Sequence, residues 1–388
     1  MSLIKAAPSE SKLFISFLRL GLTAFGGPAM VAYIKGMSVT RHKWLDEDTF
    51  KDGVALCQSI PGATAMQMAA YVGLRARGIT GALASYIGFG LPAFFLMLLL
   101  SSLYVGAYKL TWVVSLFNGL QVIVVAIIAS ATLAFGRTAL KGYKTALMAV
   151  TSAVLFWKDV SPFLVIIGAG LAGAVFFKNS GSLLTPLFPV RGTGRTYRHI
   201  VTLCVILIGG LAALYVAEKN LFHLAVLMLR IDLFAFGGGF ASLPLMLHEI
   251  VNVRGWMDSK TFMDGIALGQ VTPGPIVITS TFVGYLTHGI AGAFIATVAI
   301  FTPSFLMVTA LTPVMDRLKT SAFFLGSTKG ILASFVGLLF FVTVKFALAV
   351  PWDIVRIVLV CAAFVALIRK VDILYVVLIT AVISAVVL

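Results

Sequence analysis

Apolar stretches follow one another along most of the chain, separated by short polar connections. A helix needs roughly 20 apolar residues to cross the hydrocarbon layer of a membrane. The pattern therefore predicts an all-α polytopic membrane protein with about 13 membrane segments. They lie near residues 13–38, 49–72, 79–105, 111–136, 143–157, 161–177, 200–217, 222–247, 261–286, 289–315, 323–349, 352–368 and 372–388.

The second half of the chain repeats the first at an offset of 211 or 212 residues. "FGGPAMVAY" from Phe25 matches "FGGGFASLP" from Phe236, and "FKDGVALCQSIPGA" from Phe50 matches "FMDGIALGQVTPGP" from Phe262. Similarity at a fixed offset over roughly 90 residues indicates an internal duplication. We expect a first membrane repeat, a basic linker with one unduplicated membrane segment, and a second repeat, at residues 1–178, 179–220 and 221–388.

An odd crossing between two even repeats turns the second repeat upside down, as in many secondary transporters. Positive charge agrees with this plan, because a cytoplasmic N-terminus places most Lys and Arg residues, such as Arg75 and Arg77, in cytoplasmic connections. The opposite connections are poorer, and one external loop near 41–52 balances its cations with acidic residues. The glycine-containing segments either cross fully or turn back as re-entrant hairpins, and inversion holds if both repeats do the same.

Composition narrows the class of protein. Of the 388 residues, 60% are hydrophobic and 11% charged, and the mean hydropathy is +1.05. The net charge of +15 lies in short connections, so no nucleic-acid partner is expected. Cys57, Cys204 and Cys361 fit no metal motif and are interpreted as buried apolar residues. The histidines are dispersed and no HExxH, GxSxG or Walker A motif occurs, so we expect no enzyme, cofactor or metal.

The repeated glycine and Pro-Gly motifs predict a binding site. They break helices at mid-membrane depth, and a broken helix offers free N–H groups at a positive dipole end, which bind anions. Arg19 and Arg230 each precede the repeated phenylalanine by six residues, and on an ideal helix each shares a face with a glycine seven residues on. The predicted oxyanion pocket comprises Arg19, Phe25, Gly26, Gly27, Gln58, Pro61, Gly62, Arg230, Phe236, Gly237, Gly238, Gln270, Thr272, Pro273 and Gly274.

These residues also have structural interpretations. Glycines at this spacing let helices pack closely, and an arginine near a helix end can extend to the membrane surface. A duplicated, equally placed arginine pair nevertheless favours a functional role, because burying one arginine costs roughly 2.5–3.5 kcal/mol. Gln58 and Gln270 either donate to an oxyanion or bridge helices.

Three aspartates are weaker candidates. Asp52 and Asp264 match across the repeat and are expected to stabilise helix N-termini. Asp232 has no counterpart, since Gly21 occupies the matching place. Asp232 is therefore a candidate proton carrier or a charge partner of Arg230.

The motifs "FGGP" at Phe25, "FGGG" at Phe236, "QSIPGA" at Gln58 and "QVTPGP" at Gln270 resemble those of the chromate ion transporter (CHR) family. The resemblance runs along both halves, as in the long two-domain members. It implies a multi-pass transporter of the bacterial or archaeal inner (plasma) membrane that exports chromate, an oxyanion similar to sulfate, and confers chromate resistance.

Physical reasoning favours the same direction. Chromate is largely a dianion at neutral pH, so an inside-negative potential drives its export by about 4.6 kcal/mol per 100 mV. Uptake would need several cotransported cations. The expected partners are chromate and the lipid bilayer, with sulfate or another oxyanion as the alternative substrate. Anion exchange, a passive anion channel and a homodimer also stay open.

Overall fold

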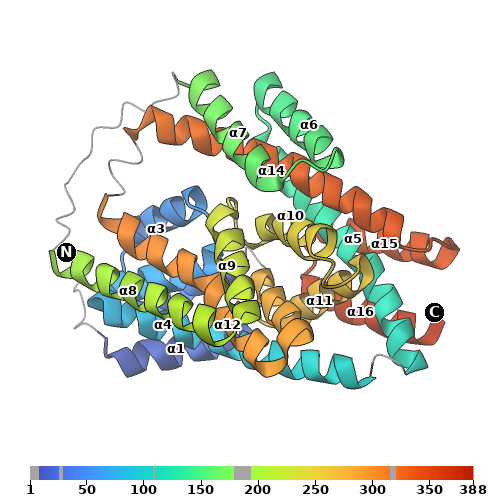
Figure 1. Cartoon of the computed structure of the whole chain (residues 1–388), viewed down its shortest axis with the longest axis horizontal. Helices are drawn as coiled ribbons and strands as arrows, with labels where there is room; N and C mark the ends of the chain where they lie inside the picture. The colour runs from blue at the N-terminus through green and yellow to red at the C-terminus, as the bar shows by residue number, and fades with distance from the viewer. Residues whose placement is uncertain (1–7, 26–28, 108–109, 179–193, 315–319, 388) are drawn as a thin grey trace. The chain divides into compact units, whose positions relative to one another are not determined.

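The computed structural model describes residues 8–25, 29–107, 110–178, 194–314 and 320–387, and regular structure in these residues is helical (Figure 1). The α-helices are α1 Glu10–Thr23, α2 Ala29–Lys35, α3 Glu47–Ser59, α4 Thr64–Ala107, α5 Thr111–Ala139, α6 Tyr143–Trp157, α7 Pro162–Phe176, α8 Gly194–Ala217, α9 Lys219–Phe234, α10 Ser242–Met246, α11 Ser259–Val271, α12 Thr279–Leu311, α14 Ala322–Ala349, α15 Ile354–Ile368 and α16 Ile373–Val387. Short π-helices, η1 Gly36–Arg41 and η3 Leu247–Val253, extend α2 and α10, and 3-10 turns occur at η2 Gly239–Ala241, η4 Ile276–Ile278 and η5 Thr312–Val314.

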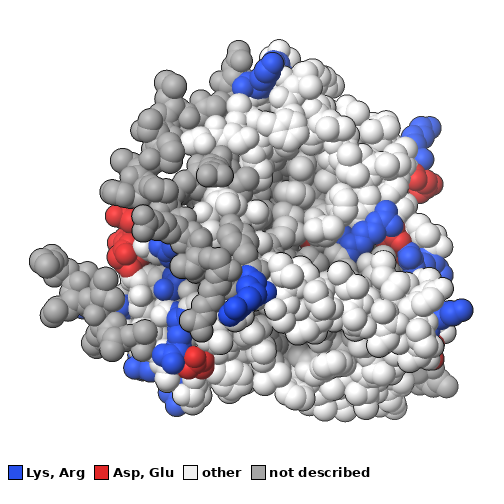
Figure 2. All heavy atoms as spheres, turned by 60° about the vertical axis from the view of Figure 1, so that its left-hand side comes forward, with Lys and Arg blue, Asp and Glu red and all other residues white. Residues whose placement is uncertain are grey.

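Length and surface chemistry confirm a polytopic membrane protein. Five helices of the described chain are long and apolar enough to cross a membrane: Thr64–Ala107, Val113–Ala139, Arg198–Ala217, Ile276–Val314 and Ala322–Ala349. Large apolar side chains are exposed along α8 and α16, for example at Val205, Ile208 and Leu378. On the face drawn in Figure 2, uncharged residues make up most of the described surface, and charged residues gather in a few groups. Such a surface is stable against lipid. The count of thirteen crossings stays a prediction.

The chain forms two compact units, and each contains segments of both sequence repeats. The first comprises Met1–Leu98, Leu184–Gly239 and Thr272–Thr320, and the second comprises Leu99–Leu183, Phe240–Val271 and Ser321–Leu388. The compact units therefore do not coincide with the sequence repeats. The repeats are interleaved within each unit.

In the first unit, α3 and the beginning of α4 form an antiparallel hairpin around Pro61 and Gly62. The Tyr71 hydroxyl donates a hydrogen bond to the carbonyl oxygen of Thr49 (3.1 Å), and a Cβ atom at Gly53 would overlap the Tyr71 ring. The α3 arm has 13 residues, about 20 Å at the helical rise, which is shorter than the hydrocarbon layer. The segment predicted near 49–72 thus turns back on itself.

A second reversal occurs inside α4 and recurs inside α12. Non-helical backbone at Arg77 and Gly78 divides α4, and the equivalent His288 and Gly289 divide α12. In α4 the flanking helices approach so closely that a Cβ atom at Gly73 would overlap the carbonyl oxygen of Gly81, and the same overlap relates the corresponding glycines of α12. The sequence duplication is therefore also a duplication of local structure.

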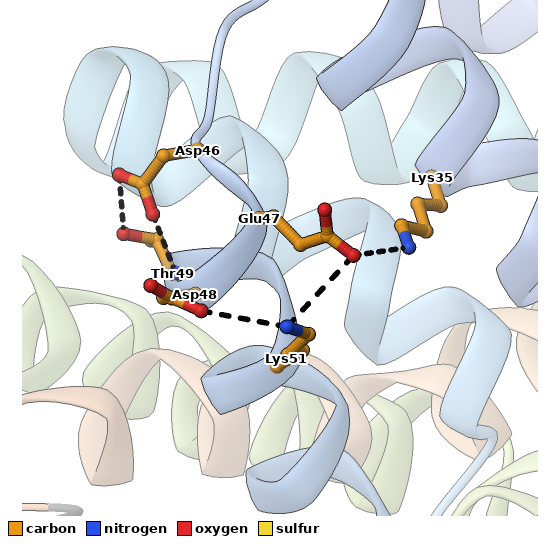
Figure 3. A network of polar contacts seen from close by, with 6 residues as sticks. All are labelled: Lys35, Asp46, Glu47, Asp48, Thr49 and Lys51. Carbon is orange, nitrogen blue, oxygen red and sulfur yellow. Dashed lines mark hydrogen bonds and ion pairs between the residues drawn. The ribbon is translucent and has the colours of Figure 1, made fainter.

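The hairpin brings the loop before α3 to the same end as the turn at Arg77. In this loop Asp46 caps α3, accepting from the Thr49 backbone N–H (2.7 Å), and this hydrogen bond holds the pKa of Asp46 below its usual value (Figure 3). Lys35 pairs with Glu47 (2.8 Å), and Lys51 lies between Glu47 and Asp48. This loop and Arg77 were expected on opposite sides of the membrane, and the structure places them at the same end of the hairpin. The side of the membrane on which each lies stays a prediction.

Helix packing in the second unit joins the two repeats reciprocally. In the first unit, α12 packs along α9 within the second repeat, and α8 packs against α9. In the second unit, α14 of the second repeat packs against α6 and α7 of the first, while the equivalent helix of the first repeat, α5, packs against α15 and α16 of the second (Figure 1). Thr132 Oγ1 lies 3.3 Å from Oγ1 of Thr343, its own counterpart 211 residues later.

Candidate functional site

The helix breaks predicted from the repeated phenylalanine-glycine motifs are present in both repeats. Helix α1 ends at Thr23 and α9 ends at Phe234, so Phe25 and Phe236 each follow the end of a helix. Gly237 and Gly238 both have φ +97°, a backbone conformation that favours glycine. Gly26 and Gly27 lie outside the described residues.

Each break pairs with the Pro-Gly turn of the other repeat. The Gly62 N–H donates to the Ala235 carbonyl oxygen (2.9 Å), and Pro61 forms an isolated antiparallel bridge with Phe236. Reciprocally, the Gly274 N–H donates to the Ala24 carbonyl oxygen (3.1 Å). Ala24 and Ala235 are equivalent residues, as are Gly62 and Gly274. Four breaks from both repeats therefore meet inside the first unit.

Glycine is required at both turns by conformation and by space. Gly62 has φ +115° and Gly274 has φ +120°, values that residues with a side chain rarely adopt. A Cβ atom at Gly62 would overlap the Ser304 hydroxyl, and one at Gly274 would lie 2.8 Å from the Ala93 Cβ atom. Ser304 and Ala93 are themselves equivalent positions, directly after Pro303 and Pro92. The two turns thus share a backbone plan and differ in the side chain that faces them.

The first turn carries a buried polar network. Asp232 Oδ2 accepts from the Ser304 backbone N–H (2.8 Å) and from the Ser304 hydroxyl (2.7 Å), and the Ser304 hydroxyl accepts from the Ala63 N–H (3.0 Å). Gln67 Nε2 donates to the Pro61 carbonyl oxygen (2.5 Å). Asp232, Ser304 and Gln67 are all fully buried.

Two members of this network were not predicted from the sequence. Ser304 and Gln67 sit inside apolar helical runs, where a single polar residue is commonly a helix-capping or packing residue. A comparison of the two repeats could have identified Ser304 as a candidate site residue. The first repeat has Gly21 and Ala93 where the second has Asp232 and Ser304, so both polar residues are departures from the repeat, and they contact each other.

The two arginines occupy equivalent places but do not lie on glycine-bearing helices as predicted. Arg19 and Arg230 each lie four residues before the last residue of their helix, and both are exposed. Because α9 ends at Phe234, the argument that one continuous helix places Arg230 and Gly237 on the same face is wrong. A role for the arginines in anion binding stays a prediction.

The remaining predicted residues are dispersed. Gln58 is exposed, Thr272 and Pro273 are buried beside Gly274, and Gln270 is half-buried at the end of α11 in the second unit. Within the residues that the structure describes, no group of three or more His, Cys, Asp or Glu side chains could hold a metal ion.

Asp264 does not stabilise a helix N-terminus as expected. It lies in the middle of α11, where its carboxylate accepts from the Tyr104 hydroxyl (2.9 Å) and from Gln121 Nε2 (2.8 Å) in the second unit. Its counterpart Asp52 is exposed. The pair that matches in sequence therefore differs in environment.

Comparisons with known proteins place these features in a family context. A family model described as "Chromate transporter" matches residues 11–174 and 222–385, one match in each repeat. An uncharacterized transporter of Methanocaldococcus jannaschii is 43% identical over 98% of this chain and 95% of its own length. Proteins of Pseudomonas aeruginosa and Cupriavidus metallidurans, each named chromate transport protein, are both 30% identical, over 87% and 86% of this chain and 81% and 82% of their own lengths. No solved structure matches the chain.

Proposed function

Because the chain belongs to the chromate transporter family, whose members are transporters rather than enzymes, we propose that it exports chromate across the inner (plasma) membrane and confers chromate resistance. The relatives named chromate transport protein support chromate as the substrate. The direction of transport rests on charge, since an inside-negative potential drives a dianion outward.

The reciprocal pairing of the helix breaks is the observation that carries the proposal. Broken backbone at membrane depth is tolerated where protein or a water-filled cavity satisfies it. Here the Gly62 N–H bonds to Ala235 and the Gly274 N–H to Ala24, so each break is partly satisfied by the opposite repeat. Transporters with discontinuous helices bind substrate at such a junction between repeats. We assign the chromate site to this junction, with Arg19 and Arg230 supplying positive charge nearby.

The proposed topology is an inverted repeat built with re-entrant hairpins. The first repeat at 1–178 and the second at 221–388 each make an even number of crossings, and the segment within 179–220 makes one. Reciprocal contacts such as Thr132 with Thr343 support a twofold relation between the repeats, because a residue contacts its own counterpart only near such an axis. The ion pairs Glu10–Arg77 and Lys35–Glu47 support a re-entrant hairpin in which α1 enters the membrane and α2 leaves it on the same side.

This topology predicts where two fusion sites lie. A reporter fused after Lys178 should be cytoplasmic and one after Leu388 should be external, because turning two of the six predicted crossings of each repeat into hairpins leaves an even number of crossings. Alkaline phosphatase and green fluorescent protein fusions report the two sides in opposite ways and check each other. If both fusions report the same side, the odd total of crossings and the inverted repeat are wrong.

Sulfate or another oxyanion remains the alternative substrate, because backbone N–H groups and arginines recognise tetrahedral dianions of similar size in the same way. Exchange of one anion for another fits the same residues. A passive channel is the less favoured alternative. A homodimer would be compatible with each of these functions.

Purified protein in liposomes tests the proposal. With a potential that is negative on the side from which chromate leaves, we expect radiolabelled chromate to cross the membrane, and we expect the flux to fall when the potential is collapsed. Competition by excess unlabelled sulfate measures how well the protein distinguishes chromate from sulfate. Protein-dependent sulfate flux without chromate flux would identify the alternative substrate, and single-channel conductance in a planar bilayer would identify a channel.

A further inference from the structure

We propose that the Asp232 carboxylate competes with the transported oxyanion for the hydrogen-bond donors at the Pro61-Gly62 turn, and that an oxyanion binds there only when Asp232 takes up a proton. The inference rests on the proposed function, since it concerns the same helix junction. It assigns proton coupling to one side chain and the principal oxyanion contacts to one of the two turns.

The first turn has the donors that an oxyanion needs, and the second lacks them. At the first turn, the Ala63 N–H and the Ser304 N–H and hydroxyl converge. The Ser304 N–H is available because Pro303, inside α12, disturbs the helical hydrogen bonding there. At the second turn, Pro275 has no N–H in place of Ala63, and Ala93 has no hydroxyl in place of Ser304.

The Ser304 donors of the first turn are occupied by a carboxylate of the protein. Asp232 Oδ2 accepts both donors of Ser304, and the Ala63 N–H donates to the same Ser304 hydroxyl. An oxyanion that approached this turn would have to take the Ser304 donors from Asp232. Two negative groups cannot share them in a buried place, because each would lose its hydration and like charges disfavour each other's ionised form.

Two further atoms show that the network lacks hydrogen-bond donors when Asp232 is ionised. Asp232 Oδ1 and Gln67 Oε1 are buried and have no hydrogen-bond partner among the described residues. Both atoms only accept hydrogen bonds when Asp232 is ionised. A proton on Asp232 converts one acceptor into a donor and removes the buried charge, so the proton improves the network that the structure leaves unsatisfied.

No cation pairs directly with Asp232 among the residues that the structure describes, so Arg230, two residues earlier on α9, does not replace the proton. The titratable group that faces it from α4 is Tyr86, whose hydroxyl donates to the Phe301 carbonyl oxygen (2.6 Å). Helices α8 and α12 pack against α9, and no charged side chain in their described parts forms an ion pair with Asp232. His288 of α12 lies 16 residues before Ser304, more than 20 Å along the helix, by about 1.5 Å a residue.

The exchange conserves atoms and charge. A proton from solvent binds a carboxylate oxygen of Asp232, and no covalent bond between heavy atoms changes. The two hydrogen bonds of Ser304 pass from the carboxylate to the oxyanion, and the Ala63 N–H turns from the Ser304 hydroxyl to the oxyanion. When the oxyanion leaves, the proton returns to solvent and the carboxylate retakes the donors of Ser304. Substrate binding and protonation of Asp232 therefore strengthen each other, as linkage requires.

Proton uptake on binding is the direct test. Sulfate and chromate are titrated into the purified full-length protein by isothermal calorimetry, in two buffers of equal pH and different ionisation enthalpy. The difference in heat gives the protons taken up for each anion bound. Sulfate is the more informative probe because it remains a dianion across neutral pH. We expect about one proton taken up for each anion, and an affinity that falls up to about tenfold for each unit rise in pH.

Asp232→Asn should bind the anion with proton uptake near zero and without this pH dependence. Asp264→Asn is the matched control, because Asp264 is also a buried aspartate held by neutral donors but belongs to the second unit. It should keep the wild-type proton uptake. Anion binding to the wild-type protein without proton uptake overturns the inference whether or not the variant folds, and so does uptake that disappears in Asp264→Asn but not in Asp232→Asn. Failure of both anions to bind would instead overturn the proposed function.

Discussion

Gly62→Ala should reduce chromate transport by more than tenfold and destabilise the protein by about 1–3 kcal/mol, the usual cost of a residue held in a sparsely populated backbone conformation. Gly62 has φ +115°, and a Cβ atom there would overlap the Ser304 hydroxyl. The methyl group would therefore displace the donors that the proposal assigns to the oxyanion. Gly274→Ala should have a similar effect on stability, because Gly274 has φ +120°.

A compensating substitution separates the causes at the second turn. The Cβ atom of Gly274→Ala would meet the Ala93 Cβ atom at 2.8 Å. Adding Ala93→Gly removes this overlap and leaves the backbone strain, so the double variant should regain part of the lost stability. Leucine at either glycine should abolish transport, although the tight packing means that expression will also fall.

Gly168→Ala in α7 is the matched control, because it is a helical glycine with open space around its Cα atom. It should transport chromate normally and be equally or more stable, since alanine favours a helix by roughly 0.5–1 kcal/mol over glycine. Flux in liposomes and thermal unfolding of the purified variants are the two measurements. Normal flux through both Gly62→Ala and Gly274→Ala would show that the Pro-Gly turns do not form the substrate pathway.

The all-helical membrane class, the duplication and the helix breaks could all be predicted from local sequence. Apolar length and repeated motifs carry that information, and glycine or proline in a helical run has a local backbone cost. The pairing of each Pro-Gly turn with the helix break of the other repeat could not be predicted in this way. It depends on contacts between residues far apart in the chain, such as Gly62 and Ala235, and such contacts leave no local sequence pattern.

The candidate site shows the same division. Pro61, Gly62, Pro273 and Gly274 were identified because each alters the backbone at its own position. Ser304 was missed because its importance comes from Asp232 in α9 and from Ala63 in the turn before α4. The sequence-based choice between a full crossing and a hairpin near residues 49–72 was open for a related reason. A full crossing and a hairpin can be built from an apolar segment of the same length. The hydrogen bond between Tyr71 and Thr49 distinguishes the hairpin from the crossing.

Arg19→Gln and Arg230→Gln should each weaken chromate binding about ten- to a hundredfold, equivalent to roughly 1.5–3 kcal/mol for a charge-assisted contact. The two arginines lie at matching places, four residues before the ends of α1 and α9, so each lies about one helical turn from a break. Both are exposed and therefore accessible to a ligand. A dianion near the breaks would interact with both guanidinium groups.

Lysine substitutions and a surface control make this prediction specific to arginine. Arg19→Lys and Arg230→Lys should recover part of the affinity, because lysine keeps the charge but lacks the planar fork that holds two oxyanion oxygens. Arg137→Gln, at an exposed arginine in the last turn of α5, should change binding little, as expected for an isolated surface charge. Binding is measured with purified monodisperse protein, so that misfolding is excluded. Wild-type affinity in both Gln variants would remove the arginines from the site and leave the backbone donors at the Pro61-Gly62 turn as its principal anion contacts.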